Sequence, residues 1–185
     1  MKTDARVRYT KMRIRDAFFD CLERKPLNRI TVKELCEMAE INRATFYKHY
    51  MDPYDLMDQI KQDCMDHFKN FIRRSEGIPP TELTTRLLAG MQDPGQRILL
   101  LCGSNGDPTF PERIADLLYQ QYLPAIKAAL PGRPENQQIA AYFFLSGGSG
   151  KLLTEWIRSG MQSAPEEVSR QLLEMCDAFM RAYAK

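Results

Sequence analysis

The feature that most constrains the fold is a pair of short helical segments between residues 31 and 50. Thr31-Val-Lys-Glu34 has the form of a capping box, in which the Thr hydroxyl accepts the Glu34 backbone N–H and the Glu carboxylate reaches back. Asn42 can cap a second helix that runs to about Tyr50. Two short helices joined by a tight turn predict a helix-turn-helix.

The rest of the chain also has helical patterns. Upstream, apolar residues recur at the spacing of one helix face: Ile14, Ala17, Phe18, Cys21 and Leu22. Asp52-Pro53 is a helix-start signal and predicts a helix to about Arg74. Pro and Gly clusters then separate segments that predict helices near 81–92, 94–103, 110–129, 135–160 and 165–184. No period-2 pattern is sustained, so the sequence predicts an all-α fold.

Composition and charge favour a globular, water-soluble protein. No segment approaches the ~20 apolar residues of a membrane helix, and the first twenty residues lack the apolar core of a secretory signal. We therefore expect a cytoplasmic protein with no membrane partner. Residues 1–50 carry 12 Lys and Arg against 7 Asp and Glu, whereas the remainder is mildly acidic. This asymmetry is typical of a small nucleic-acid-binding unit on a larger body.

The second helix of the motif has an inner and an outer set of side chains. We expect Phe46 and Tyr50, with Ile41 in the turn, to pack on the two preceding helices. The outer set is rich in hydrogen-bond donors, and a recognition helix presents such a set to the major groove. The residues predicted to contact DNA are Thr31, Arg43, Ala44, Thr45, Tyr47, Lys48 and His49.

Their side-chain chemistry assigns different roles within this set. Arg43 can reach guanine O6 and N7, and Ala44 can touch a thymine methyl. Thr45 can reach a base edge or a phosphate. The last three residues of the set are better suited to phosphates, which fix register without reading sequence.

The span from about residue 10 to residue 60 resembles the N-terminal signature of the tetracycline-repressor (TetR) family of bacterial regulators. The most specific piece is Thr45-Phe-Tyr-Lys-His-Tyr50, followed by Asp55-Leu56. The resemblance implies an all-α subunit of about nine helices, with a helix-turn-helix DNA-binding domain over 1–51. A helical ligand-binding and dimerisation domain would cover 52–185, and its last two helices would pair with a second subunit.

One position departs from the family pattern. Members of the family often carry a Lys at the position of Pro53, where it meets a phosphate. Pro53 cannot make that contact through its side chain or an N–H. The other free N–H groups at the start of the fourth helix can still face the DNA backbone.

The C-terminal part resembles the last two helices of such regulators, although less specifically. Gly147-Gly-Ser-Gly150-Lys151 is not a phosphate-binding loop, because that motif needs Gly at 145 and Ser or Thr at 152, where this chain has Leu. Small residues in a helix instead favour close packing between subunits. The predicted dimer interface comprises Gly147, Gly148, Leu152, Trp156, Leu172, Cys176 and Phe179.

The functional hypothesis is a homodimeric, ligand-responsive repressor on a palindromic double-stranded operator. A small-molecule effector would bind among apolar and amphipathic residues, predicted as Met91, Leu117, Tyr119, Tyr122, Phe144 and Trp156. An activator or a partner-controlled regulator of the same fold is the alternative, and a small all-α enzyme is a remote one. With two histidines, no HExxH or GxSxG motif and five scattered cysteines, we expect no catalytic residues, no metal site and no cofactor.

Overall fold

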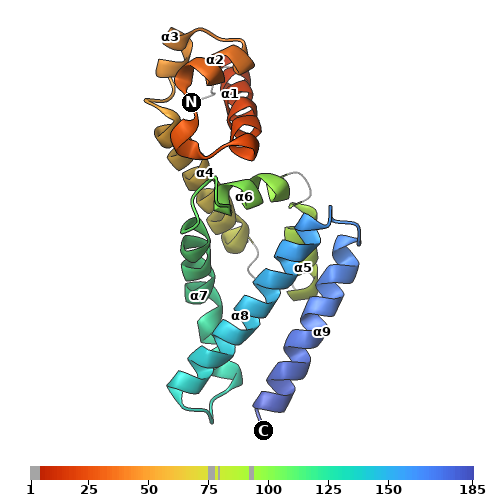
Figure 1. The fold of residues 1–185 in the computed structure, drawn as a ribbon. Coiled ribbons are helices and arrows are strands. Elements are labelled where there is room, and N and C mark those ends of the chain that lie inside the picture. Colours follow the sequence, from red (N-terminus) through yellow and green to blue (C-terminus); the bar gives the residue numbers. More distant parts are fainter. Residues whose placement is uncertain (1–4, 75–77, 79, 92–93) are drawn as a thin grey trace. The chain divides into compact units, whose positions relative to one another are not determined.

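The computed structural model describes residues 5–74, 78, 80–91 and 94–185, and within these the chain is helical. It divides into two compact units (Figure 1). The first contains residues 1–70 and 97–110, and the second contains 71–96 and 111–185. The boundaries therefore fall inside three helices, α4 (Pro53–Arg74), α6 (Pro94–Cys102) and α7 (Phe110–Ala129).

The first unit begins with four helical elements that enclose an apolar core. They are α1 (Ala5–Arg24), the short 3₁₀ helix η1 (Leu27–Arg29), α2 (Val32–Ala39) and α3 (Arg43–Tyr47). The largest fully buried side chains of the first unit are Ile14, Phe18, Leu22, Leu35, Phe46, Tyr50, Leu56, Met57, Leu101 and Phe110. These come from α1, α2, α3, the turn after α3, α4, α6 and the first residue of α7, so one core joins the helix-turn-helix to its neighbours.

Polar contacts also hold residues 97–110 within the first unit. The Asn105 side-chain amide donates to the Leu22 carbonyl at 2.9 Å, and the Asn105 carbonyl accepts the Leu27 N–H at 2.9 Å. Arg97 on α6 forms an ion pair with Asp16 at 2.7 Å. Asn105 therefore satisfies backbone groups where α1 ends, and these would otherwise lack intrahelical partners.

The second unit contains α5 (Pro80–Ala89), most of α7 (Phe110–Ala129), α8 (Glu135–Arg158) and α9 (Pro165–Tyr183). In Figure 1 the helices α8 and α9 run side by side in opposite directions, and α5 packs against α9. Phe144 of α8 stacks on Phe179 of α9 with ring centroids 4.8 Å apart. Gly160 and Met161 have left-handed backbone conformations in the turn between α8 and α9.

The all-α fold predicted from the sequence is confirmed, and the segments of helical length lie close to where the patterns placed them. One helix is shorter than expected: α3 ends at Tyr47 rather than Tyr50. The Phe46 carbonyl accepts both the His49 and the Tyr50 N–H, at 2.9 and 3.0 Å, so the chain closes a last tight turn there. This turn brings Tyr50 into the core.

A buried ion-pair cluster connects α4 to the segment before α7. The Lys61 ammonium is nearly buried and lies 2.8 Å from a carboxylate oxygen of Asp58 and 2.8 Å from one of Asp107. Lys61, with help from Thr109, lowers the pKa of Asp107 to about 2. Desolvation lowers the pKa of Lys61, but the hydrogen bonds that Lys61 donates to both carboxylates outweigh it, so the pKa is raised.

We expect Lys61→Met to lower the free energy of unfolding by about 1–3 kcal/mol, because Asp107 then loses its cation. Asp107 has a depressed folded-state pKa, so its contribution is present above its unfolded pKa and is lost as the pH falls towards 2. Denaturant titrations between pH 5 and pH 2 should therefore show a shallower loss of stability in the variant. Lys69→Met, at an exposed position of α4, is the control, and equal stability of the two variants would contradict this account.

Candidate nucleic-acid interface

The turn between α2 and α3 is formed by a residue in an unfavourable conformation. Glu40 has φ 53° and ψ 47°, the left-handed region that glycine adopts most easily. In this conformation its N–H points back to the carbonyls of Cys36 and Glu37, and the next N–H, from Ile41, bonds to Cys36 at 3.0 Å. These bonds close α2 and redirect the chain into α3.

The start of α3 is capped as the sequence predicted. The Asn42 side-chain oxygen accepts the Thr45 N–H at 2.8 Å and the Thr45 hydroxyl at 2.9 Å. At the start of α2 the Thr31 hydroxyl accepts the Glu34 N–H at 3.3 Å, which confirms half of the predicted capping box. The other half differs, because the Glu34 carboxylate pairs with Lys25, the residue after α1, at 2.5 Å.

The inner side chains of α3 and of the turn after it are deeply buried. Phe46 is fully buried and Tyr50 is 2% exposed, with ring centroids 5.7 Å apart. Ile41 is half-buried. The predicted inner set therefore lies on the core side of the motif, and Phe46 and Tyr50 fix α3 against the first unit.

The predicted DNA-contacting residues lie on the opposite side or at its edge. Thr31, Arg43, Ala44 and Lys48 are exposed, and Tyr47 is exposed over 57% of its surface. Thr45 and His49 are half-buried.

Thr45 is less free than the sequence suggested. Its hydroxyl hydrogen is directed to Asn42, so the oxygen can still accept a hydrogen bond but the donor is already used. The Thr31 hydroxyl accepts from Glu34, so its own hydrogen is still available to donate.

The pKa of His49 is lowered from its ordinary value. Partial desolvation is the main cause, and the positive charges of Lys11 and Lys48 add to it. His49 is therefore mostly neutral at pH 7, and an approaching anion would favour its charged form.

The start of α4 is less open to an anion than the sequence suggested. Asp52 caps this helix by accepting the Asp55 N–H at 2.8 Å, and Asp55 accepts the Met51 N–H at 2.8 Å. The Leu56 N–H is bonded to the Asp52 carbonyl. Of the backbone N–H groups in the first turn of α4, only that of Tyr54 is therefore left to bind an anion. Two carboxylates at this end oppose a phosphate, which narrows the contact expected there to the Tyr54 N–H and its exposed phenol.

Two ion pairs of α1 could not be predicted from sequence patterns. Arg13 of α1 pairs with Glu40 at 2.9 Å, and Arg15 pairs with Asp63 of α4. The members of these pairs are 27 and 48 residues apart in the chain, so no local periodicity relates them. They neutralise cations of α1 that are directed towards neighbouring elements rather than towards solvent.

The residues predicted to bind an effector lie in several environments. Tyr119 contacts Tyr142 and Phe143, with ring centroids 4.9 and 5.8 Å away, whereas Phe144 stacks on α9. Trp156 is 6% exposed, and its indole N–H donates to the Ser163 carbonyl at 3.0 Å. Met91 is half-buried and Tyr122 exposed, while the Leu117 side chain lies outside the described part of the structure.

The predicted dimer residues separate into open and covered positions. Gly147 and Gly148 are exposed, and a Cβ added at either would meet nothing within 4 Å. Four residues are half-buried: Leu152, Leu172, Cys176 and Phe179. Trp156 is held inside its own subunit by the bond to Ser163.

The fold and the helix-turn-helix formed by α2 and α3 define a class of protein, the helix-turn-helix transcriptional regulators. The family model described as "Transcriptional regulator C-terminal region", of TetR type, matches residues 79–178, more than half of the chain. The chain therefore belongs to the TetR family of transcriptional regulators. The matched residues begin after the helix-turn-helix, so family membership and the geometry of the helix-turn-helix are independent observations.

Two solved structures share the fold. The TetR transcriptional regulator from Streptococcus agalactiae 2603V is 23% identical, with a TM-score of 0.65 over 94% of this chain and 96% of that one. The fatty acid degradation regulator FadR from Bacillus halodurans is 13% identical, with a TM-score of 0.63 over 95% and 96%. No curated protein sequence matches the chain. Within the described residues, no helix is both long and apolar enough to cross a membrane.

The strained turn predicts an unusual stability order at one position. We expect Glu40→Gly to be more stable than Glu40→Ala by about 1 kcal/mol, because only glycine adopts the left-handed backbone without strain. Both variants lose the Arg13 ion pair, so the comparison isolates the backbone. Urea denaturation measures the difference, and an alanine variant that equals or exceeds the glycine variant would show that φ 53° imposes no cost.

Proposed function

We propose that the chain is a DNA-binding repressor that acts as a homodimer on a palindromic operator and responds to a small-molecule effector. One observation carries the proposal: α3 buries its apolar side in the core and presents Arg43, Tyr47 and Lys48 to solvent. This is the arrangement with which a recognition helix enters the major groove. The DNA-binding domain would correspond to residues 1–51 and the effector and dimerisation domain to 52–185.

The charge distribution around α3 supports DNA as the partner. Glu34, Glu37, Glu40 and Asp63 pair with Lys or Arg of the first unit. Among the described residues, no carboxylate lies within ion-pair distance of Arg43 or Lys48. The outer face of α3 therefore keeps its positive charge available for phosphates and guanine edges.

Arg43→Ala should weaken binding to the specific operator by about 10- to 100-fold, since a bidentate contact with guanine contributes about 1–3 kcal/mol. Fluorescence anisotropy with a duplex from upstream of the chain's own gene, at two salt concentrations, measures this. Adding Tyr47→Ala should abolish specific binding. The double variant is compared with Lys69→Ala, which removes an exposed charge from α4. If wild type and double variant bind equally weakly, α3 is not the reading element.

The glycines of α8 support the homodimer. A glycine inside a helix costs about 1 kcal/mol relative to alanine, and α8 contains three, Gly147, Gly148 and Gly150. A Cβ at any of them would meet nothing within 4 Å, so packing inside the subunit does not require them. Close approach of a second copy would require them.

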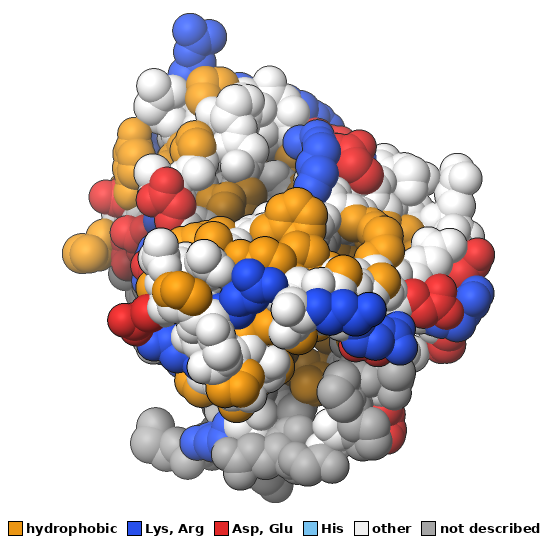
Figure 2. Space-filling view, turned by 90° about the horizontal axis from the view of Figure 1, so that it is seen from below, with side chains coloured by type: hydrophobic (Ala, Val, Ile, Leu, Met, Phe, Trp, Pro, Cys, Tyr) orange, Lys and Arg blue, Asp and Glu red, His pale blue; other side chains and the backbone are white. Residues whose placement is uncertain are grey.

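Exposed apolar surface in the second unit agrees with such an interface. Phe143 and Phe144 of α8 and Met175 of α9 are each more than half exposed. Figure 2 shows the molecule from the end that carries the C-terminus, and hydrophobic side chains gather in the middle of this face beside Lys and Arg. Large apolar side chains on an isolated subunit favour a protein partner over water.

Gly148→Leu tests the dimer. The variant should fold at least as well as the wild type, because leucine favours a helix and Gly148 is exposed with nothing within 4 Å of an added Cβ, but it should be monomeric. Light scattering after gel filtration should give about 21.4 kDa instead of twice that mass. Gly132→Leu, at another open glycine in the turn before α8, should stay dimeric. A dimeric Gly148→Leu, or a monomeric wild type, would refute this assignment.

The proposed effector would bind to the second unit. The described residues of this unit include the aromatic residues Tyr119 and Trp156, which were predicted to contact an effector. Regulators of the TetR family are typically not enzymes, which favours a binding role for this unit over a catalytic one. A calorimetric screen of small molecules that finds no ligand would favour the alternative, a partner-controlled regulator or an activator of the same fold. Pull-down of a protein partner by the purified dimer would then support that alternative.

A further inference from the structure

The cations along α1 are neutralised unevenly. Arg13 pairs with Glu40, and Arg15 pairs with Asp63. Lys11 lies about one turn earlier on the same helix, and no carboxylate of a described residue lies within ion-pair distance of it. Its side chain is nevertheless half-buried, so it is held against the protein rather than extended freely into solvent.

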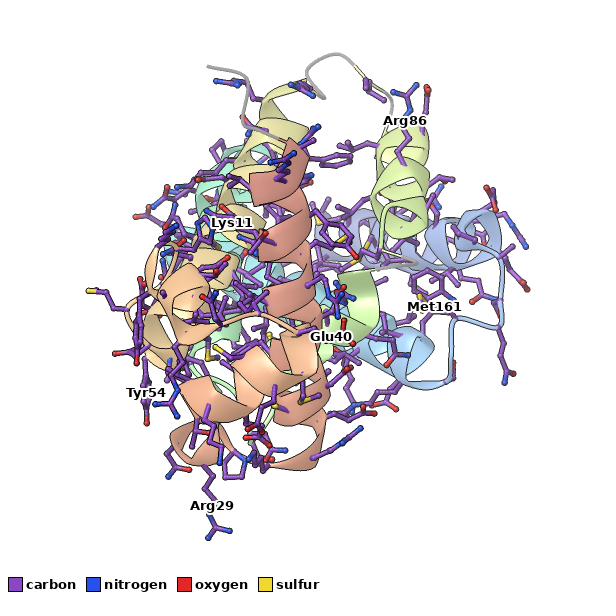
Figure 3. The ribbon with its side chains drawn as sticks, turned by 90° about the horizontal axis from the view of Figure 1, so that it is seen from above. Lys11, Arg29, Glu40, Tyr54, Arg86 and Met161 are labelled. Carbon is purple, nitrogen blue, oxygen red and sulfur yellow. The ribbon has the colours of Figure 1, made fainter. Side chains whose placement is uncertain are left out.

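Lys11 is positioned next to the end of the recognition helix. Its ammonium lies 5.7 Å from the centroid of the Tyr50 ring, in the turn that follows α3. In Figure 3 the side chain of Lys11 extends from α1, far from Arg29. The His49 ring lies beside the same Tyr50 ring, with centroids 6.3 Å apart, and the charges of Lys11 and Lys48 add to the desolvation that lowers the pKa of His49.

Lys11 and His49 both lie against the Tyr50 ring, although they come from separate elements. Lys48 precedes His49 in the chain, and nearby Asp and Glu residues pair with other cations. An anion bound among the three groups would relieve their repulsion, and it would also favour the protonated form of His49.

We propose that Lys11, Lys48 and His49 form a phosphate clamp that holds one stretch of the DNA backbone beside the recognition helix. The inference rests on the proposed DNA-binding function and adds a contact from α1, outside the helix-turn-helix. The clamp fixes the position of α3 in the groove without reading sequence. It also supplies backbone contact that the acid-capped start of α4 does not offer.

A purely structural role for Lys11 makes different predictions. A cation over the Tyr50 ring stabilises the fold whether or not DNA is present. Its loss would lower stability without changing how DNA affinity depends on salt. A phosphate contact changes that dependence, because each neutralised phosphate releases counterions and contributes about 0.9 to the slope of log K against log salt.

The test is the salt dependence of DNA binding by full-length variants. Lys11→Met keeps the apolar stem over Tyr50 and removes the charge, whereas Lys11→Arg keeps the charge. We expect Lys11→Met to reduce the slope by about one unit and to weaken binding by about fivefold at 0.15 M salt. Lys11→Arg should restore most of both. The same loss should occur on an operator duplex and on a random duplex of equal length, because phosphates are common to both.

Two controls make the result decisive. Lys69→Met removes an exposed charge from the same unit and should leave the slope unchanged. Thermal unfolding of each variant separates loss of stability from loss of contact. If wild type binds DNA and Lys11→Met keeps its slope, the clamp is wrong and the proposed function stands. If wild type binds neither duplex, the proposed function fails, and the clamp fails with it.

Discussion

The candidate interface depends on the burial of Phe46 and Tyr50 against the core of the first unit. The recognition helix has five residues, and an isolated helix of that length is not stable in water. Its conformation therefore comes from tertiary packing and from the Asn42 cap rather than from helix propensity. Each buried aromatic side chain contributes about 1.5–3 kcal/mol, so the outer side chains of α3 have fixed positions only while Phe46 and Tyr50 stay buried.

Carboxylates determine which cations remain available around this helix. The chain has a net charge of only +2, but opposite charges are not spread evenly. Glu40 supplies both the tight turn before α3 and the partner of Arg13, and Asp63 holds Arg15. These carboxylates neutralise Arg13 and Arg15, so the positive charge that remains lies at Lys11, Arg43 and Lys48. The positive charge around α3 thus depends as much on where acidic residues lie as on where basic ones do.

Short-range signals in the sequence predicted much of this structure. The Asn42 and Asp52 caps, the start of α4 at Pro53 and the burial of Phe46 follow from patterns within a few residues. Contacts between distant segments could not be predicted in the same way. The Glu34 carboxylate pairs with Lys25 instead of closing the capping box, and Asn105 bonds to Leu22 some 83 residues earlier.

The candidate site shows the same division between local and distant information. Periodicity separated the inner from the outer side chains of α3, because one helix turn relates them. It could not place Lys11 next to Tyr50, since that proximity depends on how α1 packs against the turn after α3. Asp52 and Asp55 could be read from the sequence. Only the structure shows which backbone N–H groups they bind, and therefore how few N–H groups at the start of α4 stay free.

The central claim is that the outer face of α3 and its flank on α1 contact DNA. Hydrogen–deuterium exchange of the full-length protein, with and without a bound duplex, tests it most directly. The account predicts slower exchange on binding for backbone amides near Thr31, from Asn42 to Tyr50 and around Lys11. Slower exchange confined to the second unit, with unchanged exchange from Asn42 to Tyr50, would contradict it.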